Sequence, residues 1–97
     1  MAVEVDVVYE GRLSCSATHG PSRDVIHTAA PADNGGTGSA FSPTDLVGTA
    51  LATCILTIMG LAADREQVDI TGTRVHVVKE MAPTPPRRIG KLTVRVT

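Results

Sequence analysis

The uncharged stretch of eighteen residues from Leu46 to Ala63 is the feature that most constrains this chain. Its length is at the lower edge of what a transmembrane helix needs. However, three threonines and two glycines dilute its hydrophobicity, aspartates flank it on both sides, and neither flank carries a basic cluster or an aromatic belt. We therefore expect a buried core helix rather than a membrane segment.

Residues 42–65 have the pattern of one long helix. Ser42 and Asp45 have the spacing of a capping box around Pro43, which suits the first helical position. Two faces are predicted: an apolar face at three-four spacing that is buried, and a stripe of small side chains that lets another backbone approach. The apolar face comprises Val47, Leu51, Cys54, Ile58 and Leu61, and the small stripe comprises Thr49, Thr53 and Thr57 with Gly48, Ala52 and Gly60.

Five segments alternate between apolar and polar residues, as half-buried strands do. The fold class is therefore predicted to be α+β, an antiparallel sheet of three N-terminal strands and two further strands with the long helix on one face. We expect a single domain over residues 1–97 that is incomplete at its C-terminus, because the sequence stops at the end of a strand. The predicted strands are residues 3–10, 12–18, 24–29, 71–81 and 91–97.

Composition excludes several classes of function. The net charge of −1 and the absence of Trp, with one Tyr and one Phe, argue against nucleic-acid binding. Two cysteines make no disulfide framework, no Cys/His cluster has zinc spacing, and the N-terminus carries two acids and no basic region, unlike a secretory signal. We expect a cytoplasmic protein with reduced thiols, without metal or cofactor.

Cys54, in the middle of the predicted helix, is the strongest candidate for chemistry. A buried cysteine in apolar surroundings is inert, whereas a reactive one needs a cation that stabilises the thiolate. The helix supplies no such cation, so an arginine would have to come from another segment or another subunit. Cys15, on the apolar side of the second strand, is expected to pack in the core.

At these residues the sequence resembles a known family. The run from Ser42 to Gly48, followed by Ala52-Thr53-Cys54, is similar to the helix signature of the osmotically inducible protein C and organic hydroperoxide resistance family. The loop at 31–36 and the strand at 72–75 also fit the broader bacterial branch of that family, so that the resemblance covers almost the whole chain.

The resemblance implies an intertwined homodimer with a thiol-dependent peroxidase site, active in oxidative and osmotic stress defence. Cys54 then corresponds to the thiolate that attacks an organic hydroperoxide or hydrogen peroxide and becomes a sulfenic acid. In the family a second cysteine on a later helix resolves this acid, and an external thiol reductant, lipoyl-linked in one branch, restores the pair. An arginine holds the thiolate, and a carboxylate near the helix start orients that arginine.

The sequence departs from this pattern in three respects. Thr44 occupies the position of the family's glutamate, with Asp45 one residue later. No arginine is placed unambiguously, and we select Arg23 and Arg12 as candidates. The chain also ends before the region of the resolving cysteine, so that it is either a fragment or a one-cysteine variant. A peroxidase and a non-enzymatic dimeric stress module, in which Cys54 only packs, both remain open.

Overall fold

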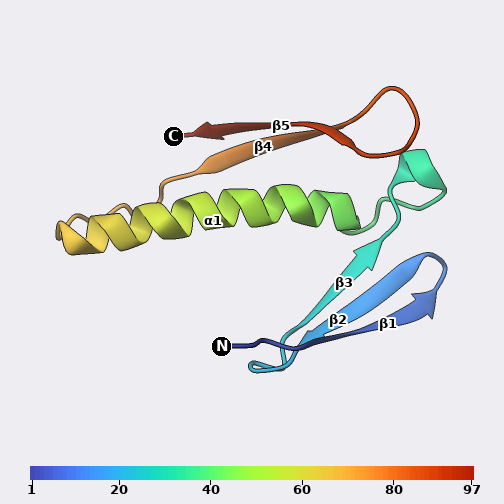
Figure 1. The fold of residues 1–97 in the computed structure, drawn as a ribbon, viewed down its shortest axis with the longest axis horizontal. Coiled ribbons are helices and arrows are strands. Elements are labelled where there is room, and N and C mark those ends of the chain that lie inside the picture. The colour runs from blue at the N-terminus through green and yellow to red at the C-terminus, as the bar shows by residue number, and fades with distance from the viewer. The chain divides into compact units, whose positions relative to one another are not determined.

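The strands divide into two separate antiparallel sheets, one on each side of the long helix in sequence. The structure, a computed structural model, describes residues 1–97. It forms two compact units, residues 1–43 and 44–97, each with its own sheet (Figure 1). The α+β class and the order of three strands, one helix and two strands are confirmed. The single sheet that we expected is instead two sheets, because each strand pairs only with its hairpin neighbours.

The N-terminal unit is a three-stranded meander. Its strands are β1 (Val5–Gly11), β2 (Ser14–His19) and β3 (Val25–Ala29), followed by a short 3₁₀ helix, η1 (Ala32–Asn34). Since side chains alternate between the two faces of a strand, the register places Val7, Ala17 and Ile26 in one row and Tyr9, Cys15 and Thr28 in the next. One face of the sheet is therefore predominantly apolar.

This apolar face is largely exposed within the chain. Val7, Tyr9 and Ile26 are 62%, 63% and 50% exposed, and Ala29 is the one buried apolar side chain in the whole chain. An exposed row of large apolar side chains is a liability for a monomer in water. An exposed apolar face of this kind is typical of a surface that another protein segment or subunit covers.

The C-terminal unit places a helix against a hairpin. Helix α1 (Pro43–Arg65) has Asp45 in its first turn and Arg65 in its last, as the helix dipole favours. The hairpin consists of β4 (Val75–Met81) and β5 (Ile89–Val96). Along β4 the odd-numbered residues 75–81 are half-buried and the even-numbered ones exposed, which is the alternation expected of a strand with one covered face.

Gly48 is where the helix approaches the hairpin closely. It is the buried residue of α1, and a Cβ built there would lie 3.4 Å from Val77 Cγ1 and 3.5 Å from Leu92 Cδ2. The atoms that Gly48 meets belong to side chains of the β4–β5 hairpin, so that the approach of another backbone to the small stripe stays a prediction.

Candidate functional site

Cys54 lies at the middle of α1 with its side chain exposed. On a helix, residues three and four positions away are its surface neighbours. These are Ala50, Leu51, Thr57 and Ile58. Cys54 is therefore accessible to a reagent from solvent and is surrounded by mainly apolar side chains of its own helix.

The apolar face of α1 is exposed in this chain, contrary to our prediction. Val47, Leu51, Ile58 and Leu61 are 51%, 40%, 59% and 51% exposed. The physical reason is that the hairpin packs on another side of the helix, where Gly48 lies against Val77 and Leu92. Spacing alone identified the apolar face but could not identify which face the chain's own hairpin covers.

Asp45 forms an ion pair at the start of the helix. Lys79 Nζ lies 2.7 Å from Asp45 Oδ1 and donates a hydrogen bond to Thr44 Oγ1 at 2.9 Å. Lys79 is only 17% exposed and belongs to β4. The sequence analysis missed this lysine, because nothing in the local pattern of a strand shows which helix residue it will meet.

Asp45 and Cys54 are not brought together within the chain. They are nine residues apart, which on a helix corresponds to about 13 Å along the axis and roughly half a turn around it. Asp45 accordingly faces β4, whereas Cys54 lies on the exposed face. The supporting role of Asp45 toward Cys54 stays a prediction.

The two candidate arginines lie in turns rather than in strands. Arg12 is in the β1–β2 turn with φ 54°, and Arg23 precedes β3 with φ 64°. Both have the left-handed backbone that is uncommon for residues other than glycine. Both belong to the N-terminal unit, whereas Cys54 belongs to the C-terminal unit. Their support of Cys54 stays a prediction.

Cys15 is half-buried in β2 and is a free thiol. Its strand neighbours are Tyr9 on β1 and Thr28 on β3. Leu13, which we expected beside it on the strand, lies in the turn with φ 61°. We expected Cys15 to pack in the core, and the structure leaves it only half-buried.

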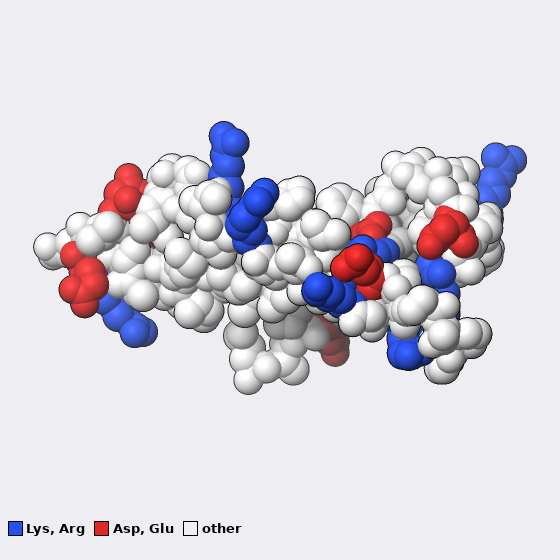
Figure 2. Space-filling model, turned by 90° about the horizontal axis from the view of Figure 1, so that it is seen from above, with Lys and Arg blue, Asp and Glu red and all other residues white.

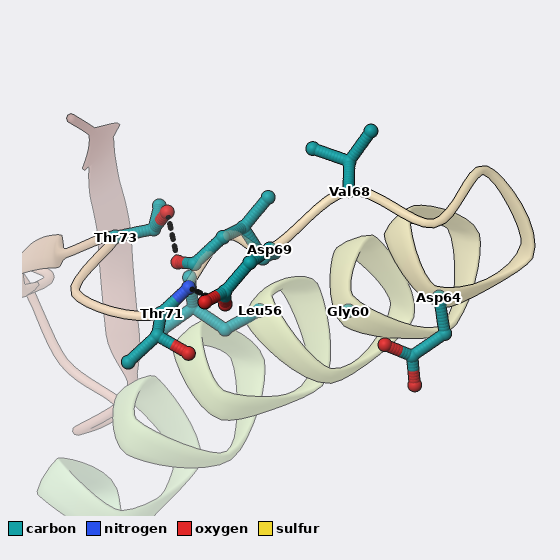
Figure 3. A pocket seen from close by; sticks show the side chains of 8 residues that line it. Leu56, Gly60, Asp64, Val68, Asp69, Thr71 and Thr73 are labelled. Atoms are coloured by element: carbon teal, nitrogen blue, oxygen red, sulfur yellow. Dashed lines mark hydrogen bonds between the residues drawn. The ribbon is translucent and has the colours of Figure 1, made fainter.

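A pocket that the sequence analysis missed lies between the C-terminal half of α1 and the loop that follows it (Figure 3). Its volume is about 280 Å³, and Cys54 is not among its lining residues. The Thr71 side chain and backbone N–H hydrogen-bond to Asp69 and lower the pKa of that carboxyl. The pocket is lined by Leu56, Gly60, Asp64, Val68, Asp69, Ile70, Thr71 and Thr73.

Charge and composition of the surface identify no further site. The face in Figure 2 carries lysines and arginines interspersed with acids rather than gathered into a basic patch. No group of three or more His, Cys, Asp or Glu side chains lies together as metal ligands would. By length and a mean hydropathy of 2.1, α1 could cross a membrane, although the core helix of a soluble protein passes the same criterion.

Comparison with known proteins identifies the family. A protein-family profile described as OsmC-like protein matches residues 36–97, which include Cys54 and all of α1. A crystal structure of a candidate osmotic stress induced and detoxification response protein from Psychrobacter arcticus 273-4 is 47% identical, with a TM-score of 0.90. The match covers 95% of this chain and 66% of that one, and no curated protein matches. The resemblance inferred from the helix signature is thus confirmed, and the chain belongs to the OsmC-like family.

Proposed function

We propose that the protein is a cytoplasmic thiol-dependent peroxidase that reduces organic hydroperoxides or hydrogen peroxide through Cys54. The observation that carries the proposal is the exposed thiol in the middle of α1, within the part of the chain that matches the OsmC-like family. The detoxification response ascribed to the Psychrobacter relative agrees with this chemistry. A merely structural cysteine would more often be buried.

The reaction begins with the thiolate, which is the nucleophilic form of cysteine. The sulfur of Cys54 attacks the terminal oxygen of the peroxide, an S–O bond forms, and the O–O bond breaks. The leaving alkoxide or hydroxide takes up a proton and departs as an alcohol or water. Cys54 is thereby oxidised to a sulfenic acid and the peroxide is reduced.

Regeneration requires a thiol reductant. A thiol attacks the sulfenic sulfur, water leaves, and a disulfide forms. A second thiol of the reductant then releases Cys54 and carries away the oxidised disulfide. We propose an external dithiol, lipoyl-linked in type, for both steps.

The functional unit is proposed to be a homodimer. OsmC-like proteins are typically dimeric, and this chain leaves large apolar side chains exposed on α1 and on the β1–β3 sheet. A second copy would cover the helix face that carries Cys54 and bring an arginine toward it. Arg12 and Arg23 are the candidates for this cation.

The decisive experiment compares Cys54→Ser with Cys15→Ser. Cys54→Ser should abolish peroxide consumption, because serine lacks the nucleophilic sulfur, while circular dichroism stays unchanged since the residue is exposed. Cys15→Ser should retain single-turnover reduction. A dimedone-type probe should label Cys54 after peroxide treatment.

Two outcomes would contradict the proposal. Native Cys54 that resists alkylation at neutral pH and consumes no peroxide would favour the non-enzymatic dimeric module. A Cys15–Cys54 disulfide as the main product of peroxide treatment would assign the resolving thiol to Cys15 and remove the need for an external reductant in that step.

A further inference from the structure

The pocket beside the C-terminal half of α1 is formed by the way the chain leaves the helix. Gln67 has a left-handed backbone, with φ 58°. The Val68 N–H donates to the Ala63 carbonyl oxygen at 2.9 Å, and the Gln67 N–H donates to the Asp64 carbonyl oxygen at 3.2 Å. These are the features of a Schellman motif, which turns the chain at the end of a helix. Residues 68–73 therefore return beside α1 and form the second wall of the pocket (Figure 3).

Hydrogen bonds within residues 69–73 hold this second wall in one conformation. Asp69 Oδ1 accepts from the Thr71 N–H at 2.9 Å. The Ile70 carbonyl oxygen accepts from the N–H of Thr73 at 3.0 Å and from its hydroxyl at 2.7 Å. The wall is thus ordered before any ligand arrives, and such preorganisation lowers the entropic cost of binding.

The helix lines the pocket with three residues at four-residue spacing, which share one side of α1. They are Leu56, Gly60 and Asp64. A Cβ built on Gly60 would meet no atom within 4 Å, so that the glycine leaves open space between the two walls. Val68, on the opposite wall, is 54% exposed and offers an apolar surface to this space.

The side chains of the pocket carry negative charge only. Of its eight lining residues two are aspartates, and none is Lys, Arg or His. The Asp64 carboxylate has no hydrogen-bond or ion-pair partner in the chain. Hydrogen bonds from Thr71 lower the pKa of Asp69, which is therefore charged at neutral pH. The C-terminal end of a helix adds partial negative charge of its own.

We propose that this pocket binds a small organic cation, an ammonium or guanidinium group on a short apolar body. The cationic group pairs with the carboxylates of Asp64 and Asp69, and the apolar body lies over Gly60 against Val68. The volume of about 280 Å³ is just below the roughly 300–1,000 Å³ of pockets for drug-sized molecules, so that the ligand is small. Cys54 does not line the pocket, and the proposal does not depend on the peroxidase function.

The test is an NMR titration of the full chain with cyclohexylammonium chloride, at neutral pH and constant ionic strength. This probe carries one ammonium group on a small apolar ring. The amide signals of Gly60 and Thr71 should shift saturably, with a dissociation constant of about 1 mM or below. Cyclohexanol, which keeps the ring and lacks the charge, should bind roughly tenfold more weakly. Ammonium chloride, which lacks the apolar body, should shift neither signal.

Substitutions test which residues form the site. Asp64→Asn and Asp69→Asn should each weaken cyclohexylammonium binding roughly tenfold, because each removes one charge-assisted hydrogen bond at nearly constant size. Glu66→Gln is the matched control, since it removes a negative charge near the same end of α1 but does not line the pocket. It should leave the dissociation constant nearly unchanged. Gly60→Leu should abolish binding while circular dichroism stays unchanged, because its side chain would fill the open space.

Three outcomes would overturn the proposal. Signals that shift linearly with cyclohexylammonium concentration, without saturation, would show that the pocket is not a binding site. Equal affinity for cyclohexanol and cyclohexylammonium would show that the pocket does not recognise the cation. Equal weakening by Asp64→Asn and Glu66→Gln would show general attraction to the acidic end of the helix instead of binding in the pocket. Each of these outcomes leaves the proposed function of Cys54 standing.

Discussion

The two faces of helix α1 are both built from uncharged residues, yet the chain treats them differently. On one face Gly48 is buried against Val77 and Leu92 of the β4–β5 hairpin. On the other face the larger side chains around Cys54 stay exposed. These large apolar side chains are thus uncovered, although their spacing predicted that they would be buried.

The difference shows that hydrophobicity alone does not decide which side of a helix its own chain covers. Gly48 lets the hairpin come within van der Waals distance, and Lys79 pairs with Asp45 at the same end of the helix. Within the C-terminal unit, the hairpin leaves the larger side chains of Val47, Leu51 and Ile58 exposed. The exposed apolar face, which carries Cys54, is the part of the helix on which the proposed dimer can be tested.

The largest expected effect is on assembly. Ile58→Glu, on the exposed apolar face, should raise the dimer dissociation constant about a hundredfold or more, because an unpaired charge would be buried at the interface. Sedimentation at micromolar concentration should then show monomers. Thr93→Glu, on the exposed side of β5, is the matched control and should remain dimeric. A dimeric Ile58→Glu variant would show that this face is not the interface.

The second effect concerns the covered face. Gly48→Leu should lower the free energy of unfolding by about 1–3 kcal/mol, because its side chain would overpack the contact with Val77 and Leu92. A Cβ at Gly60 on the same helix would meet no atom within 4 Å, so that Gly60→Leu should instead stabilise the helix by roughly 0.5–1 kcal/mol. Urea denaturation measures both. Equal changes in the free energy of unfolding for Gly48→Leu and Gly60→Leu would contradict the conclusion that the hairpin packs closely at Gly48 and not at Gly60.

The smallest effect lies in the pocket beyond the helix. Because hydrogen bonds from Thr71 lower the pKa of folded Asp69 below its ordinary 3.8, the charged carboxylate stabilises the fold above that value. This contribution is lost as the pH falls through the lowered pKa. Thr71→Val should raise the pKa of Asp69 toward its ordinary value, as a carboxyl NMR titration would show.

Thr73→Val is the control for this titration, because the Thr73 hydroxyl donates to the Ile70 carbonyl oxygen at 2.7 Å and not to Asp69. Thr73→Val should therefore leave the pKa of Asp69 unchanged. An unchanged Asp69 in Thr71→Val would mean that the side-chain hydrogen bond contributes nothing to the lowered pKa.

Local patterns were sufficient to predict most elements. Alternation at Val5, Val7 and Tyr9 predicted β1, and the uncharged run with Pro43 at its start predicted α1, which spans Pro43–Arg65. The placement of Cys54 in mid-helix followed from the same pattern. These features depend on neighbours within one or two turns, or on the alternation of one strand, and such information is contained in any short window of sequence.

The partners of these elements could not be read in the same way. The pairing of Lys79 with Asp45, the left-handed turn at Arg12 and the pocket around Asp69 each depend on segments that meet only after folding. Hydrophobic spacing predicts the buried face of a helix from residue types alone. The face that is actually buried also depends on which surfaces fit together in shape.

The sequence by itself determined the α+β class, the order of the elements, the family and the identity of the candidate nucleophile. Each of these follows from local periodicity or from a short motif. Periodicity and motifs can be recognised without knowledge of distant contacts. Only the tertiary structure decided that the strands form two sheets, that Gly48 of α1 is buried against the β4–β5 hairpin, and that Cys54 is exposed. The reason is physical: the covered side of a helix depends on the segments that meet it after folding, and here the β4–β5 hairpin meets the side of Gly48 while Cys54 stays exposed.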